Sequence, residues 1–473
     1  MSKVRKILTL VILAFILLPV SSPAQDGRTY ILQSPSLAQA QGVCQRYGFT
    51  FVSTVRDPGL YLVQASASIQ LDTLTQWTRG DGDVQAIEAN KGVRHRDSRN
   101  TNSSLPPSAP STTTVTDKGL AAVFGSTVWA AYVQQPAFYS TNVYSAAFQQ
   151  GYRGQGIIAV IDTGIDEQNP NLSSVVIPGF DFTRNTAGYA NDLADLAQST
   201  AHILHQSTAH ILHGFNTIQL NDLSAAILDA DTATALQGVT LPNDFGHGTM
   251  VAGLIHLVAP SAKLMPLKAF NADGTSNEAD IIRAIYFAAD HGANVINMSF
   301  GLPDISDALM KAINYATRKG VVCVASVGND AQTALMYPAA FGNVIGVASV
   351  NGQNQPSSFT NSGPDMVTLA APGEALVTTY PGDHYASVSG TSFSSALVAG
   401  AADVLLFQAT DPKMMTTPAF EEGDIARALR QANACVSDGS LGAGCMDMNK
   451  ALGYIRGMVL PTGYTWQSTG NHN

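Results

Sequence analysis

Short aliphatic runs alternate with segments of helical periodicity over most of the chain. The clearest runs, at residues 156–161, 263–268, 293–298 and 321–325, have the length and composition of buried strands. Between them, residues such as 281–290 repeat apolar side chains with the period of a helix. This alternation predicts an α/β fold: a doubly wound, mostly parallel sheet with helices on both faces.

Polar residues stand at or shortly after the ends of three of these runs. Asp162 ends one, Ser299 follows a second, and Asn329 follows a third. In parallel sheets of this kind, functional side chains gather at the carboxyl ends of the strands. We therefore expect these three residues to lie on one edge of the sheet.

Residues 25–96 carry a different pattern, in which four apolar runs and two helix-like stretches follow the order β-α-β-β-α-β. The expected strands are residues 29–32, 49–53, 59–63 and 84–87, and the expected helices are 37–47 and 71–77. This order predicts a small α+β domain of the ferredoxin-like type. The next segment, 97–118, is rich in Ser, Thr and Pro, as is typical of an exposed linker. Because such linkers are preferred sites of proteolysis, we expect a maturation cut between about residues 90 and 116.

The first 24 residues have the features of a Sec-type signal peptide. Basic residues precede an apolar run at 7–20, and small residues follow it up to Ala24, after which we expect cleavage. The alternative is an uncleaved anchor, but the run is shorter than the roughly 20 residues that a bilayer requires. The prediction is therefore a secreted protein, extracellular or periplasmic, with no membrane association after cleavage.

Composition agrees with a globular protein and excludes one class of partner. Of the 473 residues, 45% are hydrophobic and 13% are charged. The net charge of −10, with no basic run beyond the first few residues, argues against nucleic acid binding. We expect a monomer in which residues 119–463 form the main domain and 464–473 a tail.

Three separate segments carry the parts of an activated hydroxyl nucleophile. Asp162 ends a strand, His247 opens a helix after Gly246, and Ser392 opens a helix of small residues. Each residue alone could be a helix cap or a turn residue. Together their order, Asp then His then Ser, separates this chain from folds that use the other two orders.

The motifs around these residues resemble those of the subtilisin-like serine peptidases (subtilases, family S8). The resemblance implies a serine endopeptidase in which His247 takes the proton of Ser392 and Asp162 orients the imidazole. It also implies that Asn329 supplies the side-chain amide of the oxyanion hole, together with the backbone N–H of Ser392. Activity should then rise with pH through the titration range of histidine.

The segment after the serine departs from the usual pattern of this family. Members most often have Met-Ala-Ser/Thr-Pro-His there, whereas this chain has Phe393-Ser-Ser-Ala-Leu397. The missing proline is tolerated, because a helix does not need proline in its first turn. We interpret the chain as a divergent member with intact chemistry.

The resemblance also implies which residues contact a peptide substrate. Two short segments would line the primary pocket, and one further residue would form its floor: Ser299, Phe300, Gly301, Ser326, Val327, Gly328 and Met336. An extended peptide would bind there through its backbone. The apolar floor predicts apolar or medium-sized side chains at the P1 position.

The N-terminal domain weakly resembles the inhibitory propeptides of the same family. A zymogen whose own propeptide acts as an intramolecular inhibitor is therefore expected, and an N-terminal domain without inhibitory function is the alternative. We expect catalysis to require no cofactor. Structural calcium occurs in this family, but no Asp- and Asn-rich loop of this chain predicts a site, so none is assigned.

The four cysteines fit an exported protein. Cys435 and Cys445 flank a Gly- and Ser-containing loop, and we expect them to form a disulfide in an oxidising compartment. Cys323 falls inside an expected strand, so a buried thiol is predicted there.

A helical insertion is expected at about residues 187–237, between the aspartate and the histidine. It contains the octapeptide Gln-Ser-Thr-Ala-His-Ile-Leu-His twice in succession, at 198–205 and 206–213. The histidine pairs of each copy have i, i+3 spacing, which suggests a metal site. No carboxylate or cysteine completes a ligand set, so a duplicated surface helix is the preferred interpretation and no metal ligand is assigned.

Three further histidines have structural interpretations, and other functions require features that this chain lacks or would share its fold. His256 is expected to pack within a helix, His291 to cap one, and His384 to lie exposed in a loop. A lipase or esterase would require a Gly-x-Ser-x-Gly elbow, which Ser392 lacks. The remaining alternatives are a catalytically impaired secreted binding protein and a peptide ligase or transpeptidase that uses the same acyl-enzyme.

Overall fold

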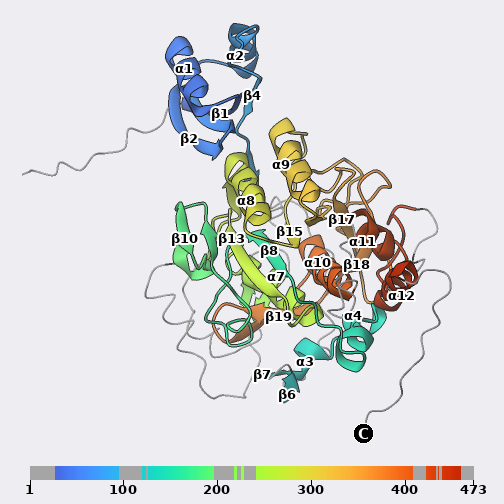
Figure 1. The fold of residues 1–473 in the computed structure, drawn as a ribbon. Coiled ribbons are helices and arrows are strands. Elements are labelled where there is room, and N and C mark those ends of the chain that lie inside the picture. The colour runs from blue at the N-terminus through green and yellow to red at the C-terminus, as the bar shows by residue number, and fades with distance from the viewer. Residues whose placement is uncertain are drawn as a thin grey trace, which may run out of the picture.

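The structure is a computed structural model that describes residues 27–94, 120–123, 126–196, 218–220, 225–227, 241–408, 422–432, 435 and 439–459. Figure 1 shows a small N-terminal domain standing on a much larger domain. The expected signal peptide, linker, octapeptide repeat and C-terminal tail lie outside the described residues. Within the described residues, no helix combines the length and apolar character needed to cross a bilayer.

The N-terminal domain has the predicted order of elements. They are β1 (Gly27–Ser34), α1 (Leu37–Tyr47), β2 (Thr50–Arg56), β3 (Gly59–Ser66), α2 (Leu71–Thr78) and β4 (Ala86–Ala89). The strands form an antiparallel sheet of order β2-β3-β1-β4. Alternate residues of β1 face opposite ways, so Tyr30 and Leu32 join the core of this domain whereas Ile31 packs in a core of the large domain.

The large domain is built on an eight-stranded sheet. In spatial order its strands are β10 (Thr186–Gly188), β9 (Gly179–Asp181), β13 (Lys263–Lys268), β8 (Ile157–Asp162), β15 (Val295–Met298), β16 (Val322–Ser326), β17 (Ile345–Val350) and β18 (Leu369–Pro372). All neighbours from β9 to β18 are parallel, and β10 pairs antiparallel with β9. The predicted fold class is confirmed.

Helices cover both faces of this sheet, because its strands are apolar on both sides. The side chains of Ile158 and Val160 pack with α7 (His247–Val258) and α10 (Thr391–Gln408). Those of Ala159 and Ile161 pack with α8 (Glu278–Asp290) and α9 (Asp307–Arg318) on the opposite face. Two helices that begin at the same edge of the sheet, α7 and α10, thus lie together on one face (Figure 1).

Shorter elements complete the domain. They are β6 (Leu120–Val123), β7 (Ser126–Trp129), α3 (Ala130–Val133), α4 (Pro136–Ser140), the π-helical turn η1 (Ser145–Gln149), the 3₁₀ turn η2 (Asp192–Asp195), α11 (Glu422–Leu429) and α12 (Met448–Val459). A second, antiparallel sheet has the order β11 (Ile218–Leu220), β12 (Ala225–Ile227), β20 (His384–Val388) and β19 (Leu376–Tyr380).

The expected helical insertion is wrong where the structure describes it. Residues 218–220 and 225–227 are strands, and β12 pairs with β20. A short apolar run fits a strand as well as a helix. Here the edge of β20 that faces away from β19 provides backbone hydrogen-bond partners. The local sequence pattern does not reveal such a distant partner.

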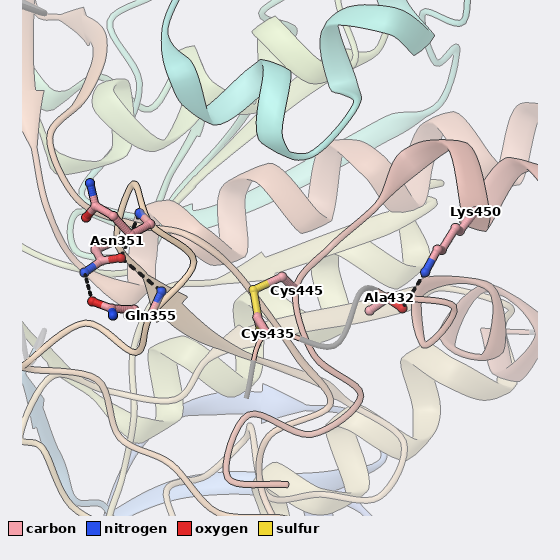
Figure 2. Close-up of a disulfide and its surroundings, with 7 residues drawn as sticks. Asn351, Gln355, Ala432, Cys435, Cys445 and Lys450 are labelled. Atoms are coloured by element: carbon pink, nitrogen blue, oxygen red, sulfur yellow. Dashed lines mark hydrogen bonds between the residues drawn. A yellow bond between two sulfur atoms is a disulfide. The ribbon is translucent and has the colours of Figure 1, made fainter. Parts of the chain in front are cut away.

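The predicted disulfide is present between Cys435 and Cys445, whose Cα atoms are 5.6 Å apart (Figure 2). It lies beside β18, where Cys445 bridges to Ala370 and the N–H of Gly363 donates to the carbonyl of Ser440. The C-terminal segment is thereby held against the last strand of the large sheet. Cys323 is buried in β16 and is not part of a disulfide.

Candidate active site

Asp162 and His247 are in direct contact at the carboxyl edge of the sheet. Asp162 is the last residue of β8 and is fully buried, and its Oδ1 lies 2.7 Å from Nδ1 of His247. The same oxygen accepts the N–H of Thr163 at 2.7 Å. Since a carboxylate only accepts hydrogen bonds, His247 carries its proton on Nδ1, and Nε2 is left as the basic nitrogen.

Glycines allow the histidine segment to approach the aspartate segment closely. Gly246 precedes α7 with φ +81°, and a Cβ there would lie 2.7 Å from the ring of Pro381. A Cβ on Gly248 would lie 1.9 Å from the carbonyl oxygen of Gly164. The Gly-His-Gly sequence is therefore required by packing as well as by chemistry.

Ser392 lies at the start of α10, next to the start of α7. Its Oγ is 3.5 Å from the carbonyl oxygen of Ser299, which follows β15. The next residue, Phe393, packs against the imidazole of His247 with 5.5 Å between ring centroids. The residue at which this chain departs from the usual family pattern is thus a direct neighbour of the histidine.

Asn329 is also brought to this point. Its Oδ1 accepts the N–H of Thr391, the residue before Ser392, at 2.9 Å. This bond fixes the orientation of the amide, whose NH₂ group is its donor end. The preceding Gly328 has φ +100°, and its N–H donates to Oγ1 of Thr391 at 3.2 Å. The strand β16 and the helix α10 are therefore joined where the site lies.

The segments expected to contact substrate lie on either side of Met336. A Cβ on Gly301 would be 3.0 Å from Cε of Met336, and a Cβ on Gly328 would be 3.9 Å from its Cγ. Phe300 and Val327 are buried in the hydrophobic core. These two residues can therefore offer a peptide only their backbone groups.

One further element at this edge was not predicted from the sequence. The strand β14 (Thr275–Asn277) leads into α8, and it pairs antiparallel with β5 (Gly92–Arg94), the last described segment before the linker. Thr275 lies opposite Arg94, and Asn277 lies opposite Gly92. A strand this short in a polar sequence gives no periodic signal, and its pairing partner is distant in the chain.

A buried lysine, also missed from the sequence, supports the aspartate loop. Lys268 is fully buried at the end of β13, in register with Asp162. Its Nζ donates to the carbonyl of Thr163 at 2.6 Å, to that of Phe270 at 2.8 Å and to Asp195 at 2.7 Å. The ammonium is thus fully coordinated, as a buried charge must be.

The three other histidines discussed above have mixed outcomes. His256 is buried within α7, as predicted, and desolvation lowers its pKa to about 4. His291 ends α8, and its ring contacts the carbonyl of Phe287 at 2.8 Å, in agreement with a capping position. The expected exposure of His384 is wrong, because this residue is buried in β20.

Among the residues that the structure describes, no group of three or more His, Cys, Asp or Glu side chains is arranged to hold a metal ion. The histidine pairs of the octapeptide repeat lie outside that part of the chain. The structure therefore does not test the metal hypothesis.

Comparison with known proteins agrees with this geometry. The model of the subtilase family (peptidase S8) matches residues 154–434. The thermophilic serine proteinase of Bacillus sp. (strain AK1) is 35% identical over 265 residues, which are 56% of this chain and 55% of the relative. Thermitase of Thermoactinomyces vulgaris is 33% identical over 261 residues, 53% of this chain and 75% of thermitase.

A solved structure shows the same fold. Fervidolysin from Fervidobacterium pennivorans, described as a keratinolytic enzyme related to subtilisin, aligns with a TM-score of 0.64 at 18% identity. The alignment covers 90% of this chain and 61% of fervidolysin. The family match spans more than half of the chain, and it contains Asp162, His247, Asn329 and Ser392. The chain therefore belongs to the subtilase family, the subtilisin-like serine peptidases.

Proposed function

We propose that this chain is a secreted serine endopeptidase, made as a zymogen, that hydrolyses peptide bonds through Asp162, His247 and Ser392. The observation that carries the proposal is the 2.7 Å contact between Asp162 and Nδ1 of His247. This contact leaves Nε2 as the base, and the ring packs on Phe393 beside the serine. Family membership supports the same reaction.

In the proposed mechanism, Oγ of Ser392 attacks the scissile carbonyl while Nε2 of His247 takes its proton. The proton then passes to the leaving amine, and water releases the acyl group by the reverse sequence. The amide of Asn329 and the backbone N–H of Ser392 would stabilise the oxyanion. Loss of such an amide lowers the rate by about 10²–10³, a figure that comes from subtilisin itself.

The substrate would bind as an added strand. The antiparallel pairing of β5 with β14 supports this proposal, because an extended peptide would pair with the same edge through its backbone. Backbone pairing is tolerant of sequence, so selectivity would come from the pocket beside Met336, with apolar or medium-sized P1 side chains preferred.

The N-terminal domain would act as the intramolecular inhibitor. Its segment β5 occupies the edge of β14, and Glu88 accepts the N–H of Ala308 at the start of α9 at 2.9 Å. Arg56 forms an ion pair with Asp290, and its guanidinium lies 4.8 Å from the ring centroid of Tyr315. The apolar contacts of Ile31 in the same interface support stable docking. Cleavage between about residues 90 and 116 would then release the enzyme.

The remaining assignments follow from the sequence and the family. Export by the signal peptide agrees with the general secretion of subtilisin relatives. We propose a monomer that acts on peptides or proteins without a catalytic cofactor, and we assign no calcium site.

Labelling of the purified protein with a fluorophosphonate, followed by casein digestion, tests the proposal. The wild-type protein and a Ser173→Ala control, altered at an exposed serine, should be labelled and should digest casein. Ser392→Ala should do neither and should be secreted uncut. Labelling without digestion would favour a ligase or transpeptidase. No labelling of the wild-type protein would favour a binding protein and would refute the mechanism.

A further inference from the structure

A second carboxylate joins the two segments that carry Asp162 and His247. Asp192 opens η2 and is fully buried. Its Oδ1 accepts the hydroxyl of Thr163 at 2.6 Å, and its Oδ2 accepts the N–H of Thr249 at 3.1 Å. The hydroxyl of Thr249 also donates to Oδ2. Thr163 directly follows Asp162, and Thr249 is two residues after His247.

The hydrogen bonds of Asp192 continue directly to the reacting pair. The N–H of Thr163 donates to Oδ1 of Asp162, the oxygen that contacts His247. Oγ1 of Thr163 also accepts the N–H of Gly248, in the first turn of α7, at 3.0 Å. Asp192 therefore engages both sides of the Asp162–His247 contact through two threonines.

The surroundings of Asp192 contain several other charged or ionisable groups. Asp162 on β8 disfavours its negative charge, Lys268 on β13 favours it, and the phenol of Tyr380 on β19 lies within electrostatic range. Burial is the largest effect and raises the pKa of Asp192 to about 7, against the hydrogen bonds from Thr163 and Thr249. A fully buried carboxylate carries a large desolvation penalty. Its placement at the junction of the two segments indicates a role beyond packing.

We infer that Asp192 is a positioning residue for the proposed reaction, whose ionised carboxylate clamps Thr163 and Thr249 and so holds Asp162 against His247. For this, both carboxylate oxygens of Asp192 must accept hydrogen bonds. A protonated Asp192, or an asparagine, presents a donor on one side of its side chain, so it cannot accept from all three donors of Thr163 and Thr249 in the present arrangement. The inference rests on the proposed peptidase function, because positioning matters only if the triad reacts.

Steady-state kinetics of the mature enzyme on a chromogenic peptide test this inference. Asp192→Asn should lower kcat by about 10- to 100-fold and leave KM within about twofold, as expected when the bound geometry of the base is lost. The matched control is Asp307→Asn, in the first turn of α9 and away from the site, which should behave as wild type. A thermal melt of each variant checks folding.

The pH profile provides a readout that a structural role alone would not change. If both His247 and Asp192 must lose a proton, the acid limb of log kcat/KM in the wild-type enzyme approaches a slope of two. In Asp192→Asn the slope should fall to one. This measurement also covers the case in which the variant fails to fold, because a wild-type slope of one would overturn the inference by itself.

The outcomes separate this inference from the proposed function. Failure of the wild-type enzyme to react with a fluorophosphonate would refute the proposed function, and the inference with it. If the wild-type enzyme is labelled and Asp192→Asn retains the kcat and pH profile of Asp307→Asn, the clamp is refuted while the peptidase assignment stands.

Discussion

Replacement of Met336 by alanine should shift the expected preference at P1, for apolar or medium-sized side chains, toward large aromatic ones. The side chain of Met336 is buried between the two segments proposed to line the pocket, with its Cε 3.0 Å from the position of a Cβ on Gly301. The substitution removes Cγ, Sδ and Cε, and so opens the space between Gly301 and Gly328.

The size of the effect follows from the burial of an aromatic ring in that space. A phenylalanine side chain gains about 1.5–3 kcal/mol when it moves from water into an apolar site. At 1.36 kcal/mol per factor of ten, the ratio of kcat/KM for Phe over Ala at P1 should rise about 10- to 150-fold. The same cavity should lower the free energy of unfolding by about 2–5 kcal/mol, because nothing fills it in the absence of substrate.

A set of peptides that differ only at P1, with Ala, Leu, Phe and Lys, measures this ratio. Met310→Ala, on α9, is the control for loss of a methionine side chain elsewhere and should leave the ratio unchanged. A folded Met336→Ala enzyme with the wild-type Phe/Ala ratio would refute the assignment of Met336 to the pocket. A strong preference of the wild-type enzyme for Lys would refute the apolar pocket.

Three further predictions concern docking, catalysis and stability. Glu278 is fully buried beside β5, and burial, followed by the nearby Glu88, raises its pKa above the ordinary value of 4.5. In the uncut Ser392→Ala chain, the loss of stability caused by ionisation of the buried Glu278 carboxyl should be absent below pH 4.5. It should develop as pH rises through the raised pKa. Glu278→Gln should therefore gain thermal stability relative to its parent as pH increases. Asn329→Ala should reduce kcat by about 10²–10³ with little change in KM. Replacement of both disulfide cysteines by serine should lower the free energy of unfolding by about 2–3 kcal/mol, as measured by urea denaturation, because the bridge closes a short loop.

Each of these has an outcome that would contradict it. Parallel pH–stability curves for Glu278→Gln and its parent would show that the carboxyl group is not titrating in the interface. A rise in KM without loss of kcat would place Asn329 in ground-state binding. Identical urea midpoints for the reduced and oxidised wild-type protein would show that the disulfide does not constrain the unfolded chain.

Local patterns were sufficient for the fold class, and they single out Asp162, His247, Asn329 and Ser392 as candidates that the structure brings to one edge of the sheet. The strand at 156–161 could be predicted because both its faces are buried, so nearly every residue is aliphatic. The glycines around His247 and Asn329 mark these segments in the sequence. Glycine is needed there because the backbone approaches other atoms closely or has a positive φ, which few other residues allow.

Features that depend on distant partners could not be predicted in this way. The pairing of β5 with β14 and the bonds of Asp192 to Thr249 join segments far apart in the chain. No residue type or local pattern predicts such contacts. His384 was misassigned because a polar residue next to Gly and Asp suggests a loop, whereas the β19–β20 hairpin buries it. Tertiary context decided each of these cases.

The anchoring of Asp192 has a consequence for how this protein can be altered. The chain between residues 197 and 240 departs just after the clamp, and it returns just before Asp244, whose N–H is bonded to the carbonyl of Ala272 at 2.9 Å. Both flanks of this stretch are thus held by hydrogen bonds of their own, and β12 within it pairs with β20. Loop closure entropy grows only slowly with length. An insertion before β11 or after β12 should therefore cost little free energy of folding, whereas one that displaces β12 would remove backbone hydrogen-bond partners from β20.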